Sequence, residues 1–223
     1  MSGKPVLYYF YGRGKMESIR WLLAAAGVEF DEVYVSTREQ YEKMIKDGDL
    51  MFHQLPLVEM DGMKLVQTKA ILTYIAEKHN LLGKDLKERV IIEMYTEGIR
   101  DLMTMIMSMP FLPQEQQEKH LNNIQNKSTG CYLPVYEKAL ANGQFLVGNQ
   151  MSCADVLLLE GLLMLEERLP SILRNFPKLQ AFQGRMKAIP NISKFLQPGS
   201  QRKSPPDEKY VKTVKEVLSH IFS

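Results

Sequence analysis

Three tyrosines stand close together near the start of the chain, beside a turn that is rich in glycine and in cations. Tyr8, Tyr9 and Tyr11 surround Phe10, and Gly-Arg-Gly-Lys follows at 12–15. A phenol hydroxyl donates a hydrogen bond, and a cation nearby favours an anion. A simple connection from a strand to a helix needs neither. The stretch therefore raises two alternatives, chemistry by one of the tyrosines or ordinary packing by all of them.

The composition narrows the class of protein. The chain of 223 residues has 28 basic and 26 acidic residues, a balance that argues against nucleic-acid binding. The N-terminus enters a strand pattern almost at once, which leaves no room for a signal peptide, and no apolar run is long enough to span a membrane. Two cysteines form no redox motif, and four scattered histidines predict no metal site. We expect a cytoplasmic protein without a metal.

The first part of the chain alternates strands and helices. Alternating side chains predict strands at 6–10, 28–35, 57–60 and 63–66, with helices at 16–26, 37–46 and 68–79. Asp61-Gly62 suits a tight hairpin turn. Pro56 stands immediately before the third strand, so Leu55 must be extended, in a setting where cis peptide bonds occur.

From Leu86 onward the pattern predicts helices only. One long helix that ends at Pro110 carries an expected core face. Ser152 and Asp155 have the spacing of a capping box, so Asp155 is expected to be structural rather than catalytic. A final amphipathic helix follows Pro205 and Pro206. The expected core face of the long helix consists of Val90, Met94, Gly98, Leu102, Met105 and Met109.

Several stretches together give the chain a family resemblance. They are KPVLYYFYGRGKMESIRWLLAAAGVEF, LVEMDGMKLVQTKAIL, GKDLKER, FLVGNQMSCADV and FLQPGSQRK. With these stretches in register, the chain resembles the cytosolic glutathione transferases, and more narrowly their alpha class. The resemblance implies an α/β thioredoxin-like N-terminal domain at 1–82. An all-α domain at 86–223 would carry an apolar-substrate pocket and a C-terminal lid helix. It also implies a dimer that conjugates glutathione to apolar electrophiles.

The resemblance assigns the chemistry to Tyr9. A free thiol has a pKa near ~8.5, so only a minority is ionised at neutral pH. A phenol O–H directed at the sulfur would stabilise the thiolate. Tyr9 matches the family's donor at the end of the first strand, and Tyr8 is interpreted as packing. Lys15 stands where the family usually has arginine and is expected to favour the anion, while Arg13 and Arg20 are expected to form structural ion pairs.

The resemblance also implies a glutathione cradle. The main chain at Leu55, ahead of Pro56, would pair with the cysteinyl peptide, and Gln54 would hold a carboxylate or amide. Gln67 and Thr68 begin a helix whose N–H groups suit the γ-glutamyl carboxylate, and Thr68 is also a good N-cap. Across a dimer, Asp101 would reach the glutamyl amino group and Phe52 would enter the partner subunit.

Two positions depart from the alpha-class pattern. Ile45 and Cys131 stand where relatives often carry arginine, and Lys46 is a possible substitute for the first. Losing both cations should weaken glutathione binding, by ~1–3 kcal/mol per charge-assisted hydrogen bond. The expected result is a raised KM for glutathione without loss of the chemistry.

The second substrate would bind among apolar side chains, and packing is the alternative for the same residues. Methionine suits a wall that adapts to varied ligands. Tyr210 stands where alpha members that favour 4-hydroxyalkenals carry tyrosine, and its hydroxyl would polarise the carbonyl oxygen. The candidates for this pocket are Phe10, Met103, Met107, Phe111, Tyr210, Leu218 and Phe222.

Two further functions stay open for this sequence. The missing cations at 45 and 131 favour a catalytically weak binding protein for apolar ligands. Peroxide reduction or steroid double-bond isomerisation would use the same thiolate.

Overall fold

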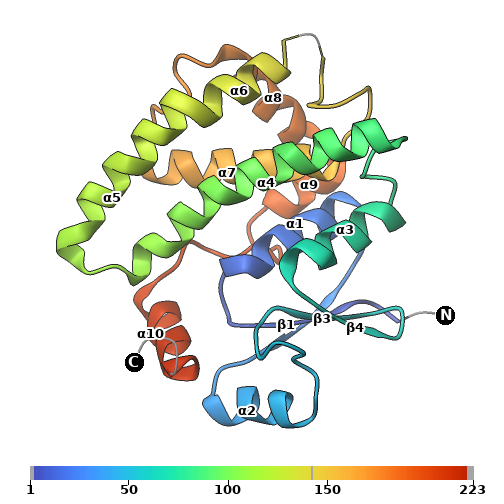
Figure 1. The fold of residues 1–223 in the computed structure, drawn as a ribbon, viewed down its shortest axis with the longest axis vertical. Coiled ribbons are helices and arrows are strands. Elements are labelled where there is room, and N and C mark those ends of the chain that lie inside the picture. The colour runs from blue at the N-terminus through green and yellow to red at the C-terminus, as the bar shows by residue number, and fades with distance from the viewer. Residues whose placement is uncertain (1–2, 142, 220–223) are drawn as a thin grey trace. The chain divides into compact units, whose positions relative to one another are not determined.

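The computed structural model describes residues 3–141 and 143–219, which form two compact units (Figure 1). The first unit contains the described residues up to Tyr74 and those from Pro198 onward. The second unit runs from Ile75 to Gln197. The segment after Pro198 thus belongs to the same unit as the first strands of the chain.

The first unit is built on a four-stranded sheet. Its strands are β1 (Val6–Tyr9), β2 (Asp31–Tyr34), β3 (Leu57–Met60) and β4 (Met63–Val66), in the order β2-β1-β3-β4. β1 pairs parallel with β2, whereas β1 with β3 and β3 with β4 pair antiparallel. The β3–β4 connection is the expected tight turn, because Asp61 and Gly62 both have positive φ, 52° and 77°.

Helices cover both faces of this sheet. The turn η1 (Gly14–Met16) leads into α1 (Glu17–Ala25), and α2 (Arg38–Lys46) follows β2. α3 (Thr68–Lys78) begins after β4 and continues into the second unit, while α10 (Glu208–Val217) contacts α2. Figure 1 shows α1 and α3 on one face of the sheet and α2 on the other. This order of strands and helices confirms the predicted thioredoxin-like domain.

The described part of the second unit is helical. α4 packs against α7 so closely that a Cβ at Gly161 would lie 2.7 Å from Ile99 Cδ1, so a side chain there would disrupt the contact. The elements are α4 (Leu86–Ser108), η2 (Met109–Phe111), α5 (Gln114–Lys127), the π-helical turn η3 (Ser128–Tyr132), α6 (Leu133–Ala139), α7 (Cys153–Arg168), α8 (Pro177–Ala188) and α9 (Pro190–Leu196).

The predicted core face of α4 is wrong for its first half. Val90 and Met94 are 52% and 68% exposed. The buried face contains Ile92, Ile99 and Ile106 instead. Both sets of apolar residues have helical spacing, so the pattern alone does not tell which face meets α7.

The start of α7 is capped as the sequence predicts. Asp155 Oδ2 accepts hydrogen bonds from the Ser152 N–H at 2.8 Å and from the Ser152 hydroxyl at 2.7 Å. Its other oxygen accepts from the Leu146 N–H at 2.8 Å. Burial raises the pKa of Asp155 to about 6, against the opposing effect of these hydrogen bonds. Asp155 is therefore structural.

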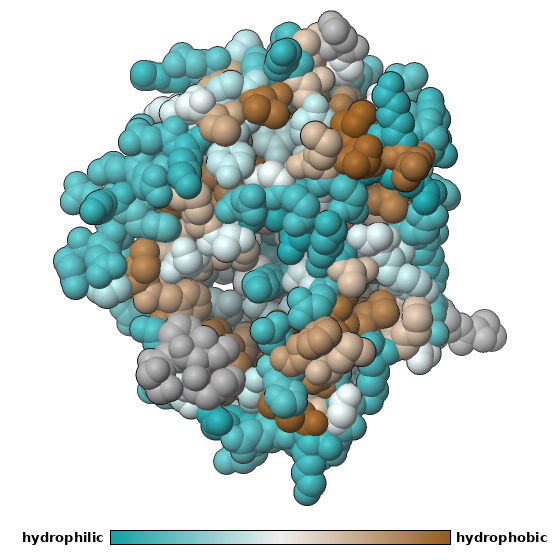
Figure 2. All heavy atoms as spheres, in the orientation of Figure 1, coloured by the Kyte–Doolittle hydropathy of each residue, from teal (hydrophilic) through white to brown (hydrophobic). Residues whose placement is uncertain are grey.

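Figure 2 shows hydrophilic side chains over most of the viewed face, with smaller hydrophobic groups between them. The large hydrophobic side chains that are exposed among the described residues include Met51, Phe52, Leu86, Val90 and Met94. Scattered exposed apolar side chains of this kind are ordinary on a folded chain.

Candidate active site at the end of the first strand

Strand β1 separates the three tyrosines by the direction of their side chains. Leu7 and Tyr9 are 1% and 7% exposed, as alternation along a strand with one buried face requires. Tyr8 is half-buried, and its hydroxyl donates to Glu59 Oε2 at 2.9 Å. Tyr11, beyond the strand, is 69% exposed. Only Tyr9 brings its hydroxyl into a buried environment.

The hydroxyl oxygen of Tyr9 accepts two hydrogen bonds. The backbone N–H of Lys15 donates to it at 3.1 Å, and the hydroxyl of Tyr210 on α10 donates to it as well. A phenol oxygen has room for about two such donors. The Tyr9 hydroxyl can therefore still donate its own proton to another partner.

Gly14 makes this arrangement possible. Its φ is +43°, and a Cβ on it would lie 2.3 Å from the Tyr9 hydroxyl and 2.7 Å from the Tyr210 hydroxyl. Gly12 has the same function for the ring of Tyr210, whose Cδ2 lies 2.3 Å from the position of a Cβ there. The role of these two glycines of the Gly-Arg-Gly-Lys turn was not predicted, although their spacing around Arg13 is a usable signal of close backbone approach.

Electrostatics keep both phenols protonated. Burial raises the pKa of Tyr9, and the hydrogen bonds from the Lys15 backbone and Tyr210, together with the charge of Arg20, oppose the rise without cancelling it. Burial also raises the pKa of Tyr210, and its hydrogen bond to Tyr9 adds to the rise. At neutral pH Tyr9 is therefore a neutral O–H donor.

The cation that acts on Tyr9 differs from the expected one. The side chain of Lys15 is exposed, and its contact with Tyr9 is made by its main chain. The positive charge of Arg20 favours the anionic form of Tyr9 and so opposes the rise of its pKa. Arg20 forms ion pairs with Glu17 at 2.8 Å and Glu32 at 2.5 Å, which confirms its predicted structural role. Arg13 donates through Nε to the carbonyl of Lys203 at 2.7 Å. A catalytic role for the Lys15 ammonium stays a prediction.

A second group of candidate residues lies where β3 begins. The Leu55–Pro56 peptide bond is cis. Among the described residues, the backbone N–H and carbonyl of Leu55 have no hydrogen-bond partner. Next to them, Gln67 Nε2 donates to Gln54 Oε1 at 3.1 Å, so the two predicted glutamines contact each other.

The start of α3 carries two unusual features. Gln67 has a φ of 69°, a strained conformation for a residue other than glycine, and such strain gathers at functional sites. The hydroxyl of Thr68 is buried and has no partner among the described residues. The helix begins at Thr68, so Gln67 takes the N-cap position that we expected for Thr68. Unpaired N–H groups at a helix start suit an anion.

The remaining predicted residues are distributed over both units. Lys46 and Phe52 are exposed in the first unit, and Asp101 is exposed on α4 in the second. Phe10 is buried and packs edge-on to the Tyr9 ring, with 5.1 Å between centroids. Leu218, at the end of α10, is half-buried.

The predicted pocket residues of α4 include one that serves packing. Met103 is 1% exposed, and its Cγ lies 3.5 Å from the position of a Cβ at Gly161, as the packing alternative expects. Met107 and Phe111 are half-buried. Phe222 lies outside the described residues.

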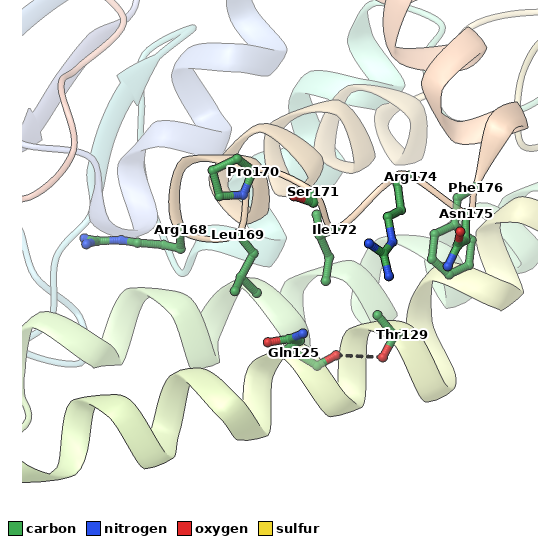
Figure 3. Close-up of a pocket in the computed structure, with 10 residues that line it drawn as sticks. All are labelled: Gln125, Thr129, Arg168, Leu169, Pro170, Ser171, Ile172, Arg174, Asn175 and Phe176. Atoms are coloured by element: carbon green, nitrogen blue, oxygen red, sulfur yellow. Dashed lines mark hydrogen bonds between the residues drawn. The ribbon is translucent and has the colours of Figure 1, made fainter.

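A cavity of about 480 Å³ lies elsewhere, within the second unit. In Figure 3, Leu169 and Ile172 point toward the segment that carries Gln125 and Thr129. None of the predicted site residues lines this cavity.

The described residues offer neither a metal-binding cluster nor a helix that could span a membrane. No group of three or more histidine, cysteine, aspartate or glutamate residues in this part of the chain is arranged to hold a metal ion. No helix found there is both long and apolar enough to traverse a membrane.

Comparison with known proteins agrees with this geometry. Residues 5–77 match the family model of the N-terminal domain of glutathione S-transferases, and residues 100–199 match a model of their C-terminal domain. The solved structure of the glutathione S-transferase from Ascaris lumbricoides is similar with a TM-score of 0.75 and 27% identity. That similarity covers 87% of this chain and 96% of the other. The chain belongs to the glutathione S-transferase family.

Full-length relatives narrow the assignment within the family. The chain is 60% identical to glutathione S-transferase 3 of Gallus gallus, over 98% of this chain and 96% of the relative. It is 60% identical to glutathione S-transferase A4 of Mus musculus and 59% identical to glutathione S-transferase alpha-4 of Rattus norvegicus. Both alignments cover 98% of this chain and 99% of the relative. Within the family, the chain is of the alpha-class type.

Proposed function

We propose that this chain conjugates the thiol of glutathione to apolar electrophiles, with Tyr9 as the donor that stabilises the thiolate. The observation that carries the proposal is the occupied oxygen of Tyr9. Because Lys15 and Tyr210 both donate to that oxygen, the proton of Tyr9 remains to point at an anion. Burial keeps this proton on the phenol at neutral pH, as a donor to sulfur requires.

Other contacts of the first unit support a glutathione cradle around this donor. The unpaired backbone of Leu55 suits an added peptide strand. The start of α3, with the unpartnered hydroxyl of Thr68 and the amide of Gln67, suits the γ-glutamyl carboxylate. Gln54, beside Gln67, adds a further amide. Lys15 and Lys46, both exposed, are proposed to pair with the negative charges of glutathione.

We test this function by affinity and by turnover. The wild type should be retained on glutathione-agarose and should conjugate an aryl halide. Tyr9→Phe removes one oxygen and should lower kcat/KM by about 10- to 100-fold, because a hydrogen bond to a charged group contributes ~1.5–3 kcal/mol. Tyr8→Phe is the matched control, since it removes a neighbouring hydroxyl that is bound to Glu59. Equal activity of Tyr9→Phe and Tyr8→Phe would contradict the proposal. Binding of apolar ligands without turnover by the wild type would favour the weak binding protein instead.

A finer proposal concerns the electrophile. When the thiolate adds to a 4-hydroxyalkenal, its sulfur forms a bond to the β carbon, and the electron pair of the C=C bond moves toward the carbonyl oxygen. The α carbon then takes a proton from water. To donate to this oxygen, the Tyr210 hydroxyl would turn its single proton from Tyr9 to the substrate. Tyr210→Phe should therefore lower kcat/KM for alkenals more than for an aryl halide. Equal losses would remove this role.

We also propose a cytoplasmic homodimer. Phe52 is 58% exposed and Met51 is 71% exposed, which suits insertion of this loop into a partner. Asp101 would then reach the glutamyl amino group across the dimer. Sedimentation of Phe52→Ser against the wild type tests this assembly, and an unchanged mass would contradict it.

A further inference from the structure

Three hydrogen bonds, each between a side chain and a main-chain group, hold the segment before α10 to Arg13, Glu17 and Phe30. Arg13 Nε donates to the carbonyl of Lys203 at 2.7 Å. The backbone N–H of Lys203 donates to Glu17 Oε1 at 3.1 Å. Gln201 Nε2 donates to the carbonyl of Phe30 at 3.1 Å. Both the N–H and the carbonyl of Lys203 are thus hydrogen-bonded, the carbonyl to a residue 190 positions away in the chain.

The side chain of Lys203 is buried in a cage of aromatic and acidic groups. Its Nζ lies 2.5 Å from Glu32 Oε2 and 3.1 Å from the Tyr34 hydroxyl. It also lies 5.4 and 5.3 Å from the ring centroids of Tyr11 and Tyr34. Lysine is rarely buried to 9% exposure unless several partners replace water, and here both an ion pair and two cation–π contacts do so.

The acidic partners are shared with Arg20. Glu17 and Glu32 each bind the Arg20 guanidinium, and Arg13 also acts on Glu17. Burial acts to raise the pKa of Glu32, but Arg20 and the hydrogen bonds from Lys203 and Tyr34 outweigh it and hold that pKa below its usual range. Without Lys203, Glu17 still has Arg20 and Arg13 beside it, and Glu32 still has Arg20. Removing the lysine charge therefore leaves both carboxylates with a cationic partner.

A short and stiff link joins Lys203 to Tyr210. Pro205 and Pro206 fix two φ angles between them. Asp207 is the N-cap of α10, and its side chain accepts from the Tyr210 N–H at 2.7 Å. Tyr210 then packs its ring on Gly12, and the absent Cβ of Gly14 makes room for its hydroxyl beside that of Tyr9. The link therefore runs from the anchor at Lys203 to Tyr210, whose hydroxyl lies beside that of Tyr9.

We propose that Lys203 is a positioning residue for the conjugation reaction, because it anchors the segment that holds the Tyr210 hydroxyl against Tyr9. The inference rests on the proposed role of Tyr9. A phenol that accepts a hydrogen bond becomes a stronger donor through its own proton. Without the anchor, Tyr210 loses its fixed position and Tyr9 stabilises the thiolate less.

The first test compares Lys203→Met with a matched control on α10. Lys209→Met removes a lysine from an exposed position of the same segment. The readout is the pH profile of kcat/KM for an aryl halide at saturating glutathione, which reports the pKa of the bound thiol. Lys203→Met should raise that pKa and lower kcat/KM near neutral pH by about 3- to 10-fold, the range of one neutral hydrogen bond. Lys203→Arg should recover part of the loss, and Lys209→Met should match the wild type. An unchanged pH profile in Lys203→Met would overturn the proposal.

The second test is a double-mutant cycle with Tyr210→Phe. If Lys203 acts through the Tyr210 hydroxyl, Lys203→Met should shift the thiol pKa in the wild type but add nothing in Tyr210→Phe. Additive shifts would overturn the proposal, as would a thermal unfolding temperature so low that loss of folded protein accounts for the effect. Tyr9→Phe in the same assay separates the two hypotheses. If it leaves the thiol pKa unchanged, the proposed function fails. If it raises the pKa while Lys203→Met does not, only the role of Lys203 fails.

Discussion

A methyl group added at Gly14 should displace the two hydroxyls of the candidate site. In Gly14→Ala the new Cβ would lie 2.3 Å from the Tyr9 hydroxyl, 2.7 Å from Tyr9 Cε1 and 2.7 Å from the Tyr210 hydroxyl. Contacts of this length do not persist, because ordinary carbon–oxygen contacts begin above ~3 Å. Both hydroxyls must therefore move away from their present positions.

The size of the effect follows from these distances. Opening the shortest contact moves the Tyr9 hydroxyl by roughly 1 Å, and a misplacement of that size in a catalytic group costs up to ~100-fold in rate. The positive φ of +43° adds ~1–2 kcal/mol of backbone strain, which acts on stability. We expect kcat/KM for an aryl halide to fall about 10- to 100-fold, with a modest fall in the unfolding midpoint.

Gly62→Ala is the matched control for strain. Gly62 also has a positive φ, +77°, but a Cβ there would meet nothing within 4 Å. Both variants should lose stability, measured by urea unfolding, and only Gly14→Ala should lose activity per folded molecule. Full activity in Gly14→Ala, or equal losses in both variants, would refute the close approach of the two hydroxyls.

Three further outcomes are expected. Cys131→Arg should lower the KM for glutathione, measured by steady-state kinetics, and an unchanged KM would remove the basis for assigning weak binding to position 131. Asp155→Ala should lower the free energy of unfolding by about 2–5 kcal/mol, because two donors of Ser152 and the Leu146 N–H lose their acceptor. A loss below ~1 kcal/mol would contradict this. The pKa of Glu32 is lowered in the folded chain, so its contribution to stability is present above its unfolded pKa and disappears as the pH falls through the folded pKa. In Glu32→Gln the free energy of unfolding should accordingly fall less steeply as the pH is lowered. A slope equal to that of the wild type would argue against the ion pairs of Glu32.

Local patterns predicted the elements of the fold well. Alternation and turn residues located β3 and β4 at the residues where they occur, and Gly27, with a φ of 71°, follows α1 as a helix-ending residue. The α4 face was missed because Met94 and Ile99 belong to two apolar stripes with the same spacing. Only the partner helix α7 decides which of them is buried.

The sequence predicted single candidate residues of the site but not the contacts between them. Tyr9 was identified through the family resemblance, and alternation along β1 explains why it is buried and Tyr8 is not. The hydrogen bond from Tyr210 joins residues about 200 positions apart, and the cage of Lys203 depends on similar long-range contacts. No local pattern contains such information. The hydrogen bond from the Lys15 main chain to Tyr9 could not be predicted either, because residue types do not reveal main-chain contacts.

Ultraviolet titration of the bound thiol tests the central claim most directly. Difference spectra of the protein with glutathione, against the protein with S-methylglutathione, follow thiolate formation with pH. We expect the bound thiol of the wild type to titrate well below the value of ~8.5 for a free thiol, and that of Tyr9→Phe to titrate close to that value. A bound thiol that titrates alike in the wild type and in Tyr9→Phe would contradict this expectation.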